Sequence, residues 1–420
     1  MTLLDDLAWR GVLYDQTPDL ADHLAGGSRS AYAGFDPTAD SLHVGSLVPV
    51  MGLARLQRHG HTPVALVGGG TGLIGDPSGK KDERSLLTPE QVEANVGGIR
   101  AQLERFLDFD GPNAARVANN ADWLVEMHAI DFLRDVGKHF TIGYMTAKES
   151  VRSRVESGLS FTEFSYMLLQ AYDFLRLYQD HGVTVQIGGS DQWGNITAGT
   201  ELVRRSAGGK AHGLVMPLVT NASGTKFGKT EAGTVWLDPA RTSPYRFYQF
   251  WLGADDRDVV GYLKYFTWLE RDEIMALEAA MQERPGARDA QRALAREVTT
   301  LVHGAAAAEA AERAGRALFG GDLSALSADA LAEVFDEAPS IDVPRQRLEG
   351  DGESLIDLMV EAGLAQSKGE ARRAVSGGGA RVGDARIADA AHRVTLSDAI
   401  DDAVVVLRKG KKSVALVRLV

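Results

Sequence analysis

The stretch from Ser30 to Ser46 reads SAYAGFDPTADSLHVGS, and it predicts the fold of the first half of the chain. Its opening run, Ser30–Phe35, is short and apolar, as expected of a strand buried in a parallel sheet. Pro37 ends this strand because proline lacks the backbone N–H that a central strand donates. The pattern from Leu42 to Arg58 then predicts a helix. A strand, a polar turn and a helix in this order are typical of an α/β fold.

The same alternation continues to about residue 220. Further strands are expected at Pro63–Val67 and Val183–Ile187, and helices at Phe161–Tyr178 and Gln192–Arg205. We therefore predict a Rossmann-like parallel sheet with helices on both faces. Such sheets bind ligands beyond the carboxyl ends of their strands.

The strand pattern is lost after about residue 240. Residues 245–335 are rich in Ala, Leu and Glu, which favour helices. Pro and Gly then punctuate 339–352, and helical and short β-like runs follow. We predict five segments: a Rossmann-like catalytic domain at 1–225, a lysine-bearing loop at 226–240, a helical domain at 241–338, a linker at 339–352 and a small α+β domain at 353–420.

The composition excludes several classes of protein. The 420 residues include no cysteine, so disulfides, thiolate nucleophiles and cysteine-bound zinc are ruled out. No uncharged apolar run is long enough to span a membrane, and the acidic N-terminal region is unlike a signal peptide. We therefore expect a cytoplasmic protein without a membrane span.

The charge is unevenly distributed. A net charge of −12 argues against a general nucleic-acid binder. In contrast, residues 351–420 carry slightly more Lys and Arg than Asp and Glu, and Arg408–Lys412 is the densest basic cluster in the chain. An affinity for polyanions is therefore expected at the C-terminal end rather than throughout.

The glycine-rich stretch Gly68–Gly75 follows a predicted strand. It formally contains G-x-G-x-x-G, but a dinucleotide site needs a helix directly after the glycines, whereas Asp76–Gly79 predicts a turn. The spacing of a P-loop is also absent. Two interpretations remain open: a loop without function, or a loop whose cations Lys80, Lys81 and Arg84 follow a phosphate.

Two further motifs indicate anion binding. His43 and Gly45 lie where a helix capped by Asp40 or Ser41 is expected to begin, so backbone N–H groups favour an anion there. The run Lys226–Thr230, KFGKT, carries two lysines around a glycine, and their charges can stabilise a transferring phosphoryl group. Each motif alone also fits a structural histidine or a solvated basic loop.

A polar face is predicted on the helix that Ser160 caps. Tyr166, Gln170 and Asp173 follow helical spacing and share one side, where they form either a small-ligand site or a solvated surface beside a packed tyrosine. The segment Gly188–Asn195 then leads from a strand into a helix. It offers backbone groups and a carboxylate suited to ribose hydroxyls.

Together these segments resemble a known family. The HVGS run at His43–Ser46 and the KFGKT run are similar to the HIGH and KMSKS signatures of class I aminoacyl-tRNA synthetases. Four other segments resemble bacterial tyrosyl-tRNA synthetases, and the similarity extends to a C-terminal RNA-binding domain of the ribosomal-protein type. These segments are Tyr32–Thr38, the loop Gly72–Lys81, the helix Phe161–Leu175 and the turn Gly188–Asn195.

The resemblance implies a role for each site residue. The tyrosine substrate would be held through its phenol by Tyr32 and Asp173, through its ammonium group by Asp76, Tyr166 and Gln170, and near its carboxylate by Gln192. The nucleotide would lie against Gly34, Asp36, His43, Gly45, Gly189 and Asp191, with Thr38 and His43 facing the phosphates. Catalysis would use Lys229 at the departing pyrophosphate, helped by Lys80, Arg84, Lys226 and Thr230. The second His of the signature is Ser46 here, which cannot act as a cation, so no equal role is assigned to it.

The resemblance also implies an activity and partners. We expect a tyrosine–tRNA ligase that uses ATP with Mg²⁺ as substrate, binds L-tyrosine and tRNA(Tyr), and forms a homodimer. Because the histidines lack metal-binding spacing, no protein-bound metal or prosthetic group is expected. The segments at 226–240 and 241–338 would be the KMSKS-type loop and the anticodon-side domain. Alternatives are a tryptophanyl-tRNA synthetase, an RNA-binding protein with an inactive synthetase fold, and a small-molecule nucleotidyltransferase.

Overall fold

The computed structural model of the chain divides into two compact units, which are described separately. The first unit contains residues 1–243 and 250–302, and the second contains 244–249 and 303–420. The structure describes residues 1–76, 87–152, 158–222, 224, 227–230, 233–318, 323, 326, 328, 331, 335, 338–410 and 413–420.

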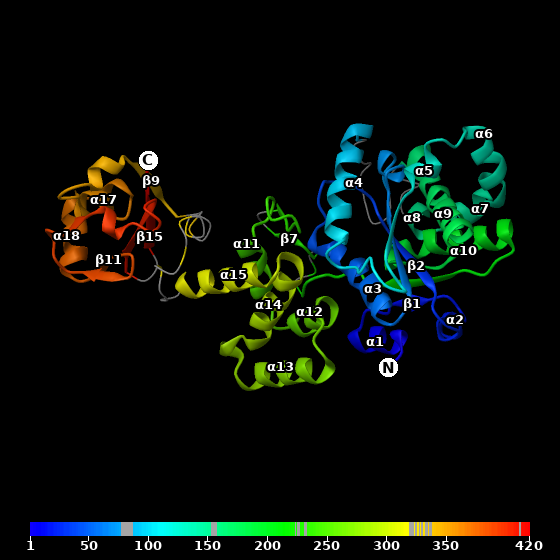
Figure 1. Ribbon diagram of the computed structural model, residues 1–420, viewed down its shortest axis with the longest axis horizontal. Coiled ribbons are helices and arrows are strands. Elements are labelled where there is room, and N and C mark those ends of the chain that lie inside the picture. Colours follow the sequence, from blue (N-terminus) through cyan, green and yellow to red (C-terminus); the bar gives the residue numbers. More distant parts are fainter. Residues whose placement is uncertain are drawn as a thin grey trace. The chain divides into compact units, whose positions relative to one another are not determined.

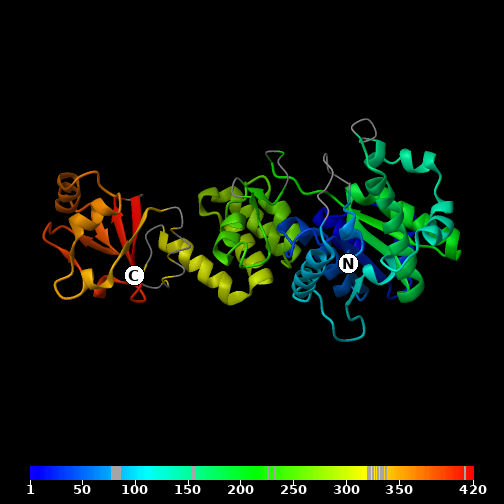
Figure 2. The same ribbon diagram turned by 90° about the horizontal axis from the view of Figure 1, so that it is seen from above.

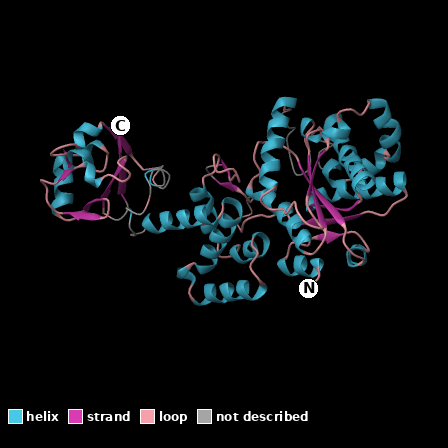
Figure 3. Ribbon diagram, in the orientation of Figure 1, coloured by secondary structure: helices cyan, strands magenta, loops and turns pink. Residues whose placement is uncertain are grey.

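A six-stranded sheet forms the centre of the first unit. Its strand order is β1-β6-β5-β2-β3-β4, and all neighbours are parallel except β1 and β6. The bounds are β1 Asp15–Gln16, β2 Ser30–Phe35, β3 Thr62–Val67, β4 Arg116–Asn119, β5 Val183–Gly189 and β6 His212–Met216. The predicted parallel Rossmann-like sheet is therefore confirmed (Figure 3).

Helices cover both faces of this sheet (Figure 1). On one face α3 packs on β2, β3 and β5, and α4 packs on β3; on the other α9 and α10 pack on each other and on β5. The bounds of these helices are α3 Leu47–Arg58, α4 Pro89–Leu103, α9 Phe161–His181 and α10 Trp193–Ala207. Alternate residues of β2 serve the two faces, as the period of a strand requires. Tyr32 of β2 therefore lies in the same apolar cluster as Leu168 and Phe174 of α9.

Shorter helices and a hairpin complete the first unit. The helices are α1 Leu3–Arg10, α2 Leu20–Ala25, α5 Ala121–Leu124, α6 Ala129–Asp131, α7 Ile142–Thr146, α8 Glu149–Arg152, α12 Val259–Phe266, α13 Arg271–Glu283 and α14 Asp289–His303. The helix α11, Pro244–Leu252, leads from the second unit back into the first. The hairpin consists of β7 Lys229–Thr230 and β8 Gly233–Thr234.

The C-terminal end of α12 is held by a buried arginine. Arg55, at the end of α3, is 2% exposed, and its Nη2 donates to the carbonyl oxygens of Lys264, Tyr265 and Thr267 at 3.0–3.1 Å. Arg10 of α1 also donates to the carbonyl of Lys264, at 3.1 Å. The last carbonyls of a helix lack partners within it, so these guanidinium groups satisfy them. Burial lowers the pKa of Arg55 to about 9.

The second unit contains a five-stranded sheet of order β12-β11-β14-β15-β9. One face of the sheet packs on α17 and α18 (Figure 2), and the other face packs on residues such as Ala314 of α15. The bounds are α15 Ala305–Leu318, α17 Leu355–Glu361, α18 Lys368–Ser376, β9 Ser340–Val343, β11 Ala380–Val382, β12 Ala385–Ile387, β14 Val404–Lys409 and β15 Ser413–Leu419, with a separate pair β10 Glu353–Ser354 and β13 Arg393–Val394. This arrangement is the α+β fold that the sequence predicts.

The structure differs from the expected linker at 339–352. Its first residues form β9, which pairs in parallel with β15 through Leu416–Leu419. The reason is burial: Val343 is fully buried in the core of the C-terminal sheet, and Ile341 packs against the same core. The prolines at 339 and 344 flank this strand rather than marking an unstructured connection. In the part of the chain that is described, no helix is long and apolar enough to cross a membrane.

We predict that Arg55→Ala lowers the free energy of unfolding of the first unit by about 3 kcal/mol. The substitution removes three charge-assisted hydrogen bonds, and the Tyr265 carbonyl loses its donor while Arg10 still reaches the carbonyls of Lys264 and Thr267. Urea unfolding followed by circular dichroism measures this. The control is Arg58→Ala, because Arg58 is exposed and stacks 3.6 Å above the ring of Trp268. It should lose about 1 kcal/mol or less; equal losses would contradict the role of Arg55.

Candidate active site

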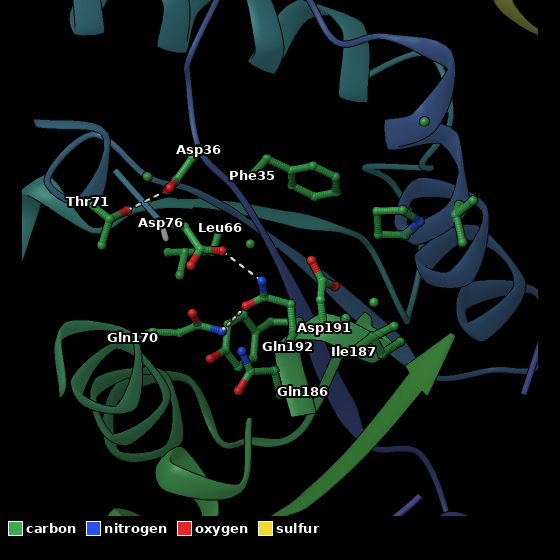
Figure 4. Close-up of a pocket in the computed structure, with 18 of the residues that line it drawn as sticks. Phe35, Asp36, Leu66, Thr71, Asp76, Gln170, Gln186, Ile187, Asp191 and Gln192 are labelled. Carbon is green, nitrogen blue, oxygen red and sulfur yellow. Dashed lines mark hydrogen bonds between the residues drawn. The ribbon is translucent and has the colours of Figure 1, made fainter. Parts of the chain in front are cut away.

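A cavity of about 320 Å³ opens at the carboxyl ends of β2 and β5. The strand order reverses at β2, because β3 and β4 lie on one side of it and β5 and β6 on the other. Such a reversal leaves a crevice in an open parallel sheet. The structure brings most of the expected site residues together around the cavity: Tyr32, Gly34, Asp36, His43, Gly45, Asp76, Tyr166, Gln170, Asp173, Gly189, Asp191 and Gln192. Figure 4 shows part of this lining.

Asp173 lies at the buried end of the cavity. Its Oδ1 accepts from Trp123 Nε1 at 2.7 Å and its Oδ2 from Asn120 Nδ2 at 2.9 Å. The side chain is 2% exposed, and this burial raises the pKa of the carboxyl to about 7 although both hydrogen bonds lower it. The two donors orient the carboxylate and leave lone pairs available to a ligand.

Tyr32 lines the same cavity from β2. Its ring is 1% exposed and meets the ring of Phe174 edge-on at 5.2 Å. The buried hydroxyl finds no hydrogen-bond partner among the described residues. A buried hydroxyl without a partner is costly, so a polar ligand atom that reaches it gains binding energy. Burial, together with the charge of Asp173, raises the pKa of Tyr32 well above its usual value.

A second carboxylate, Asp36, is fixed by two hydroxyl groups. Tyr166 donates to Asp36 Oδ2 at 2.7 Å, and Thr71 donates to Asp36 Oδ1 at 2.8 Å. Asn120 donates to Thr71 Oγ1 at 2.9 Å as well as to Asp173. Hydrogen bonds therefore connect the two carboxylates across the glycine-rich loop, which begins after β3.

An amide network forms the wall between α9 and α10 (Figure 4). Gln192 Nε2 donates to Asp76 Oδ2 at 2.7 Å, and Gln170 Nε2 donates to Gln192 Oε1 at 3.2 Å. Asn195 donates to Gln170 Oε1 at 2.9 Å. Each amide is thereby oriented, and carbonyl and carboxylate oxygens gather where a cationic group can be held.

The position expected for His43, in the first turn of a helix, is wrong. His43 is extended, with φ −120° and ψ 169°, and α3 begins only at Leu47 after a short 3₁₀ turn. Neither Asp40 nor Ser41 caps this helix; instead Nδ1 of His43 accepts from the backbone N–H of Gly45 at 3.0 Å. A side chain at position 45 would collide with the imidazole, since a Cβ there would lie 2.8 Å from His43 Cε1.

The cause is a pairing between distant segments. Val44 N donates to Val235 O at 3.0 Å and Leu237 N donates to Leu42 O at 2.8 Å, so residues 42–44 form the edge of a short antiparallel pair with residues 235–237. Local sequence contains no sign of this partner, since His43 and Trp236 are 193 residues apart. The two signature motifs are therefore adjacent in space, because residues 235–237 directly follow the hairpin that contains Lys229.

Several expected residues are not seen in the cavity lining. Thr38 is exposed and lies outside the lining, with its backbone N–H donating to Asp36 O at 2.9 Å. Lys80, Arg84 and Lys226 lie outside the described residues. Lys229 and Thr230 form β7, of which only the backbone is described. Their expected catalytic roles remain predictions.

Four polar residues were not foreseen: Thr71, Asn120, Trp123 and Gln186. Thr71, Asn120 and Gln186 line the cavity, and Trp123 reaches Asp173 from α5. A signal was present, because Asn119 and Asn120 come at the end of β4, at the edge of the sheet where ligands bind. In the described parts of the chain, no group of three or more His, Cys, Asp or Glu side chains is arranged to hold a metal ion.

Comparison with known proteins assigns the class. Residues 25–320 match the family described as tRNA synthetases class I (W and Y), and residues 331–417 match the tyrosine–tRNA ligase SYY-like C-terminal domain. The chain therefore belongs to the class I aminoacyl-tRNA synthetases, in the group that handles tryptophan and tyrosine.

Relatives place it more closely. It is 60% identical to the tyrosine–tRNA ligase of Roseiflexus castenholzii over 100% of both chains, and 53% identical to that of Geobacillus stearothermophilus, also over 100% of both. A crystal structure of a C-terminally truncated mitochondrial tyrosyl-tRNA synthetase from Aspergillus nidulans matches with a TM-score of 0.69 and 32% identity, over 76% of this chain and 94% of that one. Within its class, the chain is a member of the tyrosine–tRNA ligase family.

The raised pKa of Asp173 predicts how stability depends on pH. The carboxyl has a usual pKa of 3.8 and titrates near pH 7 in the fold, so the folded state keeps this proton longer than the unfolded state. The contribution of Asp173 to stability is then complete below about pH 4 and is lost as the pH rises toward about 7. In the absence of substrates, the free energy of unfolding of the wild type should fall relative to Asp173→Asn by roughly 2–3 kcal/mol from pH 5 to pH 8. Urea titrations at both pH values measure it, and parallel pH profiles would contradict the raised pKa.

Proposed function

We propose that this cavity activates L-tyrosine with ATP, and that the protein then transfers the tyrosine to the 3′ end of tRNA(Tyr). The observation that supports this most directly is the deep polar end of the cavity. There a buried, oriented carboxylate at Asp173 lines the same pocket as the buried hydroxyl of Tyr32, which has no partner among the described residues.

A phenol fits this end of the cavity. The hydroxyl of a tyrosine substrate donates to Asp173 and accepts from Tyr32, so both buried groups gain a partner. Phenylalanine lacks the hydroxyl and leaves both unpaired in a dry site, which is costly. The pocket therefore discriminates by hydrogen bonding rather than by size.

The amino-acid backbone fits the amide wall. Oxygens of Asp76, Gln170 and Tyr166 hold the ammonium group, and Gln192 lies near the carboxylate, as the resemblance implies. The hydrogen bond between Gln192 and Asp76 supports this, because it places a group for the carboxylate next to a group for the ammonium of the same amino acid.

The nucleotide is proposed to occupy the opposite rim. Gly34 and Gly45 leave room for it, Gly189 and Asp191 meet the ribose, and His43 meets the phosphates. Support for this comes from Gly34, where a Cβ would meet nothing within 4 Å. ATP enters with Mg²⁺ as a complex. Thr38 lies outside the described cavity lining, and we propose that it meets the phosphates from there.

The chemistry needs no acid–base residue with a tuned pKa. A carboxylate oxygen of tyrosine attacks the α-phosphorus of ATP, the bond from that phosphorus to the bridging oxygen breaks, and pyrophosphate leaves with the electron pair. Catalysis then consists of positioning the reactants and stabilising charge on the departing pyrophosphate. The cations proposed for this are Lys229, Lys226, Lys80 and Arg84, and the hydroxyl of Thr230 is proposed to assist them.

The second unit is proposed to bind tRNA, and the whole protein to act as a homodimer. Exposed arginines on its sheet, including Arg381, Arg386 and Arg418, support contacts with phosphates. Exposed apolar side chains between residues 125 and 161, among them Ile130 and Ile142, support an interface with a second copy. A cytoplasmic location remains a prediction from the sequence.

The test of the amino-acid assignment is exchange of labelled pyrophosphate into ATP, with tyrosine, tryptophan and phenylalanine compared. We expect exchange with tyrosine alone. Asp173→Ala should raise the KM for tyrosine at least about 10-fold and leave the KM for ATP unchanged, because a hydrogen bond to a charged group is lost. An unchanged tyrosine KM would remove Asp173 from the phenol site, and exchange driven by tryptophan would replace the proposed substrate.

We predict that a chain ending at residue 338 forms tyrosyl-adenylate at the wild-type rate but no longer charges tRNA. This end point removes β9 together with β15, whereas one at residue 349 leaves β9 without its partner strand. In the full-length protein, tRNA binding should weaken steeply as salt rises, since phosphate contacts release counterions. Unimpaired charging by the shortened chain would contradict a role of this domain in tRNA binding.

A further inference from the structure

The turn between the lysines of the KFGKT motif carries a buried aromatic ring. Phe227 is 6% exposed, and its ring lies 5.0–5.7 Å from the ring centres of Phe250, Trp251, Tyr262 and Phe266. The ring of Phe266 is stacked on it with an interplanar angle of 8°. We call these four side chains of α11 and α12 the aromatic socket. Packing among four rings fixes Phe227, and with it this part of the turn.

The aromatic socket is itself held in place. Phe266 is the last residue of α12, and the carbonyls around it are bound by Arg55 of α3, as described above. The first residue of α3 follows directly after the HVGS signature. The helix that starts at the HVGS motif therefore also fixes the aromatic socket that holds the KFGKT motif.

A second contact joins the motifs directly. Gly228 has φ +79°, and a Cβ there would lie 2.6 Å from Val44 Cγ2, so only glycine allows this approach. The carbonyl of Gly228 accepts from Val235 N at 3.1 Å, and the carbonyl of Val235 accepts from Val44 N at 3.0 Å. The contacts of Phe227 and Gly228 therefore fix the backbone immediately before Lys229.

We propose that Phe227 is a positioning residue for formation of the adenylate. Its ring, seated in the aromatic socket, sets the place of residues 228–230 relative to His43, and so the place from which Lys229 meets the phosphates. The inference rests on the proposed function, which assigns Lys229 to the leaving pyrophosphate. Misplacement of a catalytic group by about 1 Å can cost about 100-fold in rate. A leucine at position 227 fills part of the socket but cannot make the stacked contact with Phe266 or the tilted contacts with the other three rings.

The experiment compares Phe227→Leu with the wild type in single-turnover formation of tyrosyl-adenylate. We expect the rate constant to fall roughly 10- to 100-fold, while the dissociation constant for tyrosine changes less than about 2-fold. Phe266→Leu should show the same split, because Phe266 belongs to the socket but not to the cavity lining. The double variant should be little slower than the slower single variant, since both changes remove one interaction.

The matched control is Phe140→Leu. Phe140 is 8% exposed and packs in an apolar cluster of the first unit away from the KFGKT turn. This variant should lose stability comparably, as urea unfolding measures, yet keep a rate constant within about 2-fold of wild type. Because Phe227 is proposed to act through Lys229, its substitution should cost no more than Lys229→Ala. That variant should slow adenylation about 100- to 1,000-fold, by analogy with loss of an oxyanion donor.

Three outcomes overturn the proposal. In the first, Phe227→Leu slows adenylation no more than Phe140→Leu. In the second, Phe227→Leu weakens only the binding of tyrosine, which means that the ring contacts the substrate. In the third, the rate losses of Phe227→Leu and Phe266→Leu multiply in the double variant. Failure of the proposed function is seen separately, in the wild type. If the wild type exchanged pyrophosphate with another amino acid instead of tyrosine, the same comparison with that amino acid would still decide the role of Phe227.

Discussion

The site depends on the reversal of strand order at β2. Because β3 and β5 pair with opposite edges of this strand, the loops that follow β2 and β5 diverge and leave a cavity between them. Many of the groups around the cavity, such as Tyr32, Tyr166 and Asp173, lie on a strand of the sheet or on a helix packed against it. The amino-acid end of the cavity is therefore set by these elements, whereas the loop that contains His43 is held by its pairing with residues 235–237.

The described lining of the cavity is acidic, which gives a reason for the lysine-bearing motifs of the sequence. In the described lining, four aspartates, Asp36, Asp76, Asp173 and Asp191, occur without any lysine or arginine. Such a lining favours an ammonium group and ribose hydroxyls but repels phosphates. Cations for the phosphates are therefore needed besides the described lining, and the segments at 80–84 and 226–229 contain the lysines and the arginine proposed for this.

How much the sequence predicts depends on the range of the interactions. The strand Ser30–Phe35 and the polar face of Tyr166, Gln170 and Asp173 follow from local periodicity, and the structure agrees with both. The extended conformation of His43 does not follow from any local signal, because it results from pairing with residues 235–237. The site roles of Asn120 and Trp123 could not be predicted for the same reason, because both donate to the carboxylate of Asp173, which lies some fifty residues later in the chain.

The length of α3 sets the spacing between the HVGS run and the end of α12. The helix begins directly after the HVGS run, and Arg55, near its last turn, donates hydrogen bonds to the end of α12. Inserting or deleting a single residue would rotate Arg55 by about 100° around the helix and shift it by about 1.5 Å along the axis, away from the carbonyls that it holds. Arg58, the one exposed residue of α3, is thus open to change in side chain, whereas the length of the helix is not.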